Sequence, residues 1–75
     1  MKKLVINNKV RKHRFLKEEM TQLELANELG VSRQTIVAIE KGKYSPSLEL
    51  AFKLSRVFNM RIDDLFYIGE LNESI

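Results

Sequence analysis

The sequence predicts an all-α, or mainly helical, fold of five short helices, to which a small antiparallel ribbon of the two chain ends is added as a hypothesis. Three observations support this prediction. The chain has 75 residues, which suffices for a single small domain over residues 1–75. Apolar residues recur at helical spacing behind a series of residues that favour helix N-caps. Short segments at the two chain ends are rich in β-branched and aromatic residues.

Capping residues set the limits of the first two helices. Asn8 precedes a helix predicted over about residues 9–17, because its side chain can accept a hydrogen bond from the first turn. Thr21 and Glu24 have the spacing of a capping box, which begins the second helix. Gly30 ends that helix, since glycine adopts the left-handed conformation at little cost.

The same signals predict three further helices. Ser32 caps a third helix, which ends at Gly42, and Ser47 caps a fourth, which runs to about Asn59. The segment "IDDLF", which begins at Ile62, predicts one more helical turn. From the second predicted helix onward, a short connection therefore joins each helix to the next.

The chain ends carry the strand prediction. Residues 3–6 and 67–71 form segments that are each too short to be stable as a strand alone. We expect the two to pair as an antiparallel ribbon beside the helices. The alternative is that both ends are frayed.

Composition narrows the classes of function. With no cysteine, and His13 as its one histidine, the chain offers no disulfide, no Cys-based zinc site and no thiol catalysis. His13 has no nucleophile beside it, so an enzyme is not expected, nor is a metal, a cofactor or a small-molecule ligand. The apolar run near the start is too short to span a membrane, and we expect a cytoplasmic protein without membrane contact.

Charge is unevenly distributed along the chain. The net charge is +3, but residues 1–17 carry seven Lys or Arg and no acidic residue. Residues 62–75 carry four acidic residues and no basic one. Such a basic region is either a solvated surface or an electrostatic contact for a polyanion, and charge alone does not decide between them.

The connection between the second and third helices is only three residues long, so the two helices must cross steeply. Ala26 lets the third helix approach closely, and Gly30 supplies a positive φ. Ile36 and Ile39 give the third helix a buried stripe. This spacing makes residues 21–42 the core of a predicted motif.

The opposite side of the third helix is polar. The residues that face outward there are Gln34, Val37, Ala38 and Lys41, with Arg33 beside them. Arg and Gln can bond the edges of guanine and adenine in a major groove, and a small apolar side chain suits a thymine methyl group. Just past the helix, Lys43, Tyr44 and Ser45 suit phosphate contacts. The alternative is an ordinary solvent-exposed helix followed by a polar loop.

One acidic residue of the third helix is expected to face inward. Glu40 falls beside Ile36, where an unpaired carboxylate would be costly. Arg14 holds the same position relative to Val10 in the first helix. We therefore predict an ion pair between Arg14 and Glu40 that joins the first helix to the third.

The fourth helix and the segment after it contain more apolar residues than one buried stripe requires. We expect a second copy of the chain to cover the surplus in a two-fold homodimer, the alternative being that the terminal ribbon covers it. The residues predicted for this interface are Leu54, Phe58, Met60, Ile62 and Leu65.

The stretch "TQLELANELGVSRQTIVAIEKGKYSPSLELAFKLSRVFNMRIDDLF" resembles the helix-turn-helix domain of the Xre family, the type found in Cro and CI repressors of lambda-like phages. The resemblance covers roughly residues 8–67 and implies a lambda-repressor-like five-helix domain. It also implies that Gln22, residues 32–35, Val37 and Lys41 approach DNA, and that Arg14 pairs with Glu40. The segment "KEEM" is one residue longer than the usual turn of that family. The chain ends resemble those of a short, dimeric subgroup.

Residue pattern and resemblance together predict a DNA-binding regulator of transcription. We expect a homodimeric repressor that binds double-stranded DNA at a two-fold operator, with half-sites about 34 Å apart. An antitoxin that uses the same domain is the alternative. The expected base contacts are Arg33, Gln34, Thr35 and Val37. The expected contacts to the DNA backbone are Gln22, Ser32, Lys41, Lys43 and Tyr44.

Overall fold

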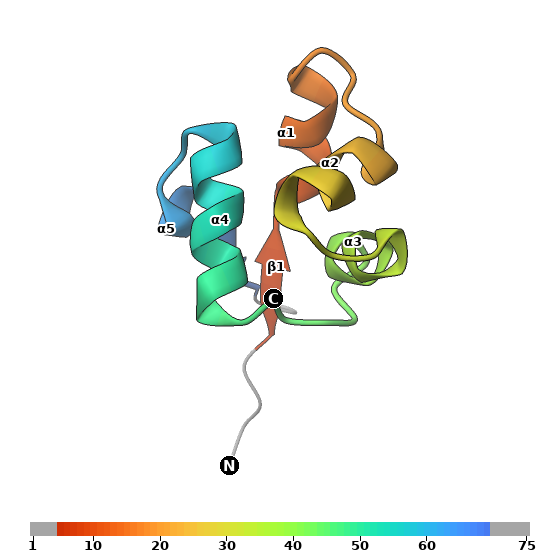
Figure 1. Cartoon of the computed structure of the whole chain (residues 1–75). Helices are drawn as coiled ribbons and strands as arrows, with labels where there is room; N and C mark the ends of the chain where they lie inside the picture. The colour runs from red at the N-terminus through yellow and green to blue at the C-terminus, as the bar shows by residue number, and fades with distance from the viewer. Residues whose placement is uncertain (1–4, 70–75) are drawn as a thin grey trace.

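The computed structural model describes residues 5–69, which form five helices and two short strands (Figure 1). In chain order these are β1 (Ile6–Asn8), α1 (Val10–Leu16), α2 (Gln22–Leu29), α3 (Arg33–Glu40), α4 (Leu48–Phe58), α5 (Ile62–Leu65) and β2 (Phe66–Ile68). The predicted mainly helical fold with a terminal ribbon is confirmed. Within residues 5–69, no helix is both long and apolar enough to cross a membrane.

Side-chain caps begin three of the helices. The Thr21 hydroxyl accepts a hydrogen bond from the Glu24 N–H at 3.0 Å, and the Glu24 carboxylate accepts one from the Thr21 N–H at 2.8 Å. This is the predicted capping box. Ser32 and Ser47 each accept a hydrogen bond from the N–H three residues further on, at 3.2 and 3.1 Å. Each such cap contributes about 1 kcal/mol to helix stability. The capping residues that the sequence predicts therefore set the starts of α2, α3 and α4.

Residues in the left-handed conformation follow the same helices. Gly30 follows α2 with φ 73°, Gly42 lies just beyond α3 with φ 75°, and Asn59 follows α4 with φ 54°. After Gly30 the Val31 N–H donates to the Ala26 carbonyl at 3.0 Å, which closes the last turn of α2. The chain can then enter α3 after three residues.

The two strands pair at the ends of the described chain. β1 and β2 are antiparallel, with Ile6 opposite Ile68 and Asn8 opposite Phe66. Their polar neighbour Lys9 continues the pairing, because its N–H donates to the Leu65 carbonyl at 2.9 Å. The ribbon therefore leads directly into α1.

The first strand lies further along the chain than the predicted segment at residues 3–6. It extends to Asn8 because the ladder needs only backbone groups, so the polar character of Asn7 and Asn8 does not end it. Residues 3, 4, 70 and 71 of the two predicted strands lie outside the described residues.

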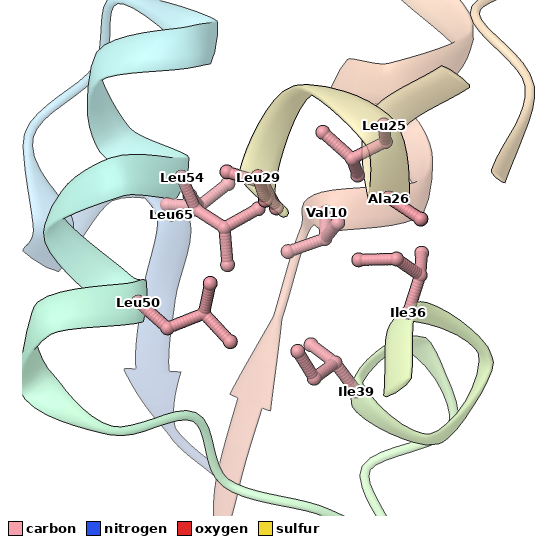
Figure 2. Packing of buried hydrophobic residues seen from close by; sticks show 9 residues of the cluster. All are labelled: Val10, Leu25, Ala26, Leu29, Ile36, Ile39, Leu50, Leu54 and Leu65. Carbon is pink, nitrogen blue, oxygen red and sulfur yellow. The ribbon is translucent and has the colours of Figure 1, made fainter. Parts of the chain in front are cut away.

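The core is built around Val10 (Figure 2). Ile36 and Ile39 of α3 point toward Val10 from one side, and Leu54 and Leu65 approach from the other. The buried cluster comprises Val10, Leu25, Ala26, Leu29, Ile36, Ile39, Leu50, Leu54 and Leu65. Each fully buried Leu, Ile or Val side chain contributes roughly 1.5–3 kcal/mol. Because α3 is held by its inner side, its outer side is left for other contacts.

The prediction that Leu54 and Leu65 lie at a dimer interface is wrong. Both side chains are 0% exposed within one chain. Both belong to the buried cluster around Val10, where they join α4 and α5 to the remaining helices. Phe58 and Met60 are partly buried against the same core, and Ile62 is half-buried. The apolar surplus of α4 lies elsewhere, at Leu48 and Phe52, which are 70% and 54% exposed.

Candidate nucleic-acid interface

The α2–turn–α3 unit sets the position of the predicted DNA-facing residues. α3 packs chiefly against α2, where Ala26 is buried beneath it. Gly30 has a positive φ at the turn, which an L side chain adopts only with strain. Figure 1 shows α3 nearly end-on, on the opposite side of β1 from α4. The outer side of α3 is thus directed away from the remaining helices.

The first turn of α3 presents the leading predicted base contacts. Arg33 and Gln34 are both exposed to solvent. Thr35 is half-buried, and its hydroxyl lies 3.0 Å from that of Ser32, the residue that caps the helix. Val37, one turn further on, is also half-buried. These positions offer two long polar side chains at the tip of the helix and a small apolar one behind them.

The residues predicted to contact the DNA backbone lie on both sides of α3. Lys41, Lys43 and Tyr44 are exposed in the segment that follows the helix. Gln22, at the start of α2, is half-buried, and its side-chain nitrogen donates to Glu40 at 3.1 Å. Since that hydrogen bond uses one of its two amide N–H groups, the other is left to donate to a phosphate.

The expected ion pair between Arg14 and Glu40 is present and is bidentate. Arg14 Nε donates to Glu40 Oε2 at 2.7 Å, and the Arg14 NH2 group donates to Oε1 at 3.2 Å. The remaining Arg14 nitrogen donates to the Met20 carbonyl at 2.7 Å. One guanidinium therefore joins α1, the turn before α2 and the last turn of α3.

Asn8 makes a second polar contact to the end of α3. The sequence pattern predicts one of its two hydrogen bonds but not the other. Asn8 accepts a hydrogen bond from the Val10 N–H at 3.0 Å, which is the helix-start role that the pattern predicts. Its amide nitrogen also donates to the Ile39 carbonyl at 2.8 Å. Asn8 lies in β1, so the ribbon is connected to the end of α3. Nothing in the local pattern could show this, because the partner is 31 residues away.

Two shallow depressions bring predicted contact residues together. One lies beside α3 and is lined by Gln22, Val37, Glu40, Lys41 and Arg11. The other lies at the start of α2, and its lining includes Gln22, Arg33 and again Arg11. The sequence pattern did not single out Arg11. A signal for Arg11 is nevertheless present in the sequence. Arg11 is three residues before Arg14, so the two residues are neighbours on one face of the helix.

This fold and this site define a helix-turn-helix unit, a class in which the second helix enters the major groove of DNA. The exposed side chains of α3 and of the segment that follows it are basic or neutral, which suits contact with phosphates. Within the part of the chain that the structure describes, no group of three potential metal ligands occurs.

Comparison with known proteins assigns the family. Residues 11–65 match the helix-turn-helix family HTH_3, and the chain belongs to this family, which confirms the Xre-type resemblance. The chain is 56% identical over 61 residues to an uncharacterized HTH-type transcriptional regulator of Methanocaldococcus jannaschii, covering 81% of this chain and 91% of the relative. It is 63% identical over 51 residues to one of Archaeoglobus fulgidus, covering 68% and 73%.

A repressor is also among the relatives. The chain is 35% identical over 68 residues to the cryptic phage CTXphi transcriptional repressor RstR of Vibrio cholerae. That match covers 91% of this chain and 60% of the repressor.

Proposed function

We propose that the protein is a sequence-specific DNA-binding repressor of transcription, which acts in the cytoplasm as a homodimer on a two-fold symmetric operator. The observation that carries this proposal is the position of Arg33 and Gln34. Both are exposed on the first turn of a helix that is fixed from behind by Ile36 and Ile39. The repressor role is further supported by the similarity to RstR.

The proposed readout follows from the chemistry of the exposed side chains. Arg33 can donate two hydrogen bonds to a guanine edge, and Gln34 can bond an adenine edge bidentately. Thr35 can bond a neighbouring base, and Val37 can contact a thymine methyl group. Each bidentate contact contributes about 1–3 kcal/mol of discrimination against the wrong base. Rigid support of α3 matters here, because a helix that shifts in the groove loses this geometry.

The contacts to the DNA backbone set the position of α3 in the groove. Gln22 and Ser32 lie at the starts of α2 and α3, whereas Lys41, Lys43 and Tyr44 follow the end of α3. The two groups would thus meet the phosphates on opposite sides of the groove. All five contacts are independent of sequence, and the affinity that Lys41 and Lys43 contribute falls with salt.

The homodimer is proposed on the exposed apolar side chains of the α4 and ribbon surface. Leu48 and Phe52 are one turn apart on α4, and Ile6 and Ile68 face each other in the ribbon. Figure 1 shows the first turn of α4 and the start of β1 at the same end of the molecule. A second copy would cover these side chains, with the partly exposed Phe58, Met60 and Ile62 at its margin.

Selection of bound duplexes from a random DNA pool, with the purified protein, tests the proposal. We expect an enriched site that reads the same on both strands about its centre, with half-sites about one helical turn apart. Recovery of duplexes without a shared sequence would contradict a sequence-specific function. A shared site without two-fold symmetry would contradict the dimeric arrangement alone.

A further inference from the structure

Arg11 of α1 lies among the residues proposed to contact DNA. It is exposed, and it lines the depression that Val37 and Lys41 share beside α3. It also lines the depression at the start of α2, together with Arg33. The Arg11 side chain therefore lies beside both the outer side of α3 and the start of α2.

The charge of Arg11 is available to a ligand. Among residues 5–69, Arg11 forms no ion pair. The carboxylate that lines the depression beside α3 is that of Glu40, whose two oxygens already accept hydrogen bonds from Arg14 and Gln22. The depression at the start of α2 is also lined by the exposed Glu19, which forms no ion pair with Arg11. A third depression extends from Arg11 along α1 and is lined by further basic residues, Lys9 and Lys12. The surface around Arg11 is thus suited to a polyanion.

The position of Arg11 also indicates which part of a DNA duplex it would meet. It shares both depressions with Gln22, whereas Lys43 and Tyr44 lie beyond the opposite end of α3. With α3 in the major groove, Arg11 would therefore face the phosphates of the strand that Gln22 contacts. α1 would thus add to a binding surface otherwise formed by α2, α3 and the segment after α3.

We propose that Arg11 is a further DNA contact, which binds a backbone phosphate of the strand facing Gln22. This inference rests on the proposed function. A phosphate rather than a base is the ligand, because Arg11 belongs to α1 and lies beside the helix that would occupy the groove. Its contribution is therefore to affinity, not to the choice of sequence.

Arg11→Ala tests the proposal, with Arg56→Ala as a matched control. Arg56 is also exposed, and its replacement removes the same charge, but it belongs to the last turn of α4, the helix on the opposite side of β1 from α3 in Figure 1. Dissociation constants are measured for the selected operator and for a scrambled duplex over a range of salt. We expect Arg11→Ala to weaken binding to both duplexes by a similar factor, about 3- to 10-fold, and to reduce the salt slope by about 1 per chain.

One further variant and the melting temperatures separate a phosphate contact from other roles. Arg11→Lys keeps the charge and should retain most of the affinity, while Arg56→Ala should bind like the parent. The melting temperature of Arg11→Ala should stay near that of the parent, because the side chain is exposed. A fall in melting temperature shared by Arg11→Ala and Arg11→Lys, together with weaker binding, would assign Arg11 a structural role and overturn the proposal.

The remaining outcomes also decide the matter. If Arg11→Ala binds both duplexes as tightly as Arg56→Ala and the parent do, Arg11 is not a phosphate contact, while the proposed function stays intact. Loss of affinity for the selected operator alone would identify a base contact instead. If the parent shows no sequence preference, the proposed function fails, but weaker binding of Arg11→Ala to every duplex would still support the phosphate contact.

Discussion

Arg14 Nε lies 2.7 Å from Glu40 Oε2, and the two side chains are only 14% and 5% exposed. The pair joins α1 to α3, and Gln22 donates to the same carboxylate. Glu40 thus links the last turn of α3 to the residue at the start of α2 that is proposed to contact DNA. Glu40, a charged residue near the end of the sequence motif, therefore has a supporting role rather than a contact role.

Glu40→Ala should destabilise the fold by about 3–5 kcal/mol, since it leaves the Arg14 guanidinium without its partner in a largely buried site. Urea or thermal unfolding measures this directly. Replacing both residues, as Arg14→Met with Glu40→Leu, should cost less than Glu40→Ala alone, because no unpaired charge remains. Glu28→Ala, at an exposed position of α2, is the control. Unfolding of Glu40→Ala at the parent's denaturant concentration would contradict this account.

The turn between α1 and α2 contains two non-glycine residues in the left-handed conformation, Glu18 with φ 56° and Glu19 with φ 55°. Such a conformation costs about 1–2 kcal/mol for a residue with a Cβ, and glycine avoids that cost. Glu19→Gly should therefore stabilise the protein by about 0.5–1 kcal/mol after the added entropy of the unfolded chain is counted. Glu28→Gly, in the last turn of α2, should instead destabilise it, by up to about 1 kcal/mol. A lower melting temperature for Glu19→Gly would show that this turn is not strained.

Phe52→Asp should convert the proposed dimer into monomers. It places a charge in the exposed apolar surface of α4 and leaves the core unchanged, because Phe52 is 54% exposed. Sedimentation equilibrium measures the association, and binding to a two-half-site operator should weaken with it. Leu23→Asp is the control for the sedimentation, since Leu23 is equally apolar and is 55% exposed on α2, away from this surface. If both variants sediment like the parent, the α4 and ribbon surface does not form the dimer.

Local sequence signals predicted most of the fold. Thr21, Ser32 and Ser47 begin helices in the structure, and Gly30 ends one, because caps and left-handed residues act within a few positions of the chain. The Arg14 and Glu40 pair could also be inferred, since helical spacing showed that each side chain faces inward. These inferences succeeded where the physical cause is local or periodic.

Long-range arrangement limited the remaining predictions. An apolar count does not show that the chain itself covers Leu54 and Leu65, so the sequence alone does not separate them from a dimer surface. The hydrogen bond of Asn8 to Ile39 and the approach of Arg11 to α3 depend on how α1 is placed against α3. That placement results from packing around Val10, which no local pattern describes.

In the proposed complex, the exposed first turn of α3 reads base pairs while the segment after it binds the DNA backbone. Comparing Arg33→Ala with Lys43→Ala, on the selected operator and on a scrambled duplex, separates the two roles. Arg33→Ala should weaken the operator complex by about 1–3 kcal/mol and change the scrambled complex little. Lys43→Ala should weaken both complexes alike and flatten the salt dependence. Equal losses on both duplexes for Arg33→Ala would contradict the claim.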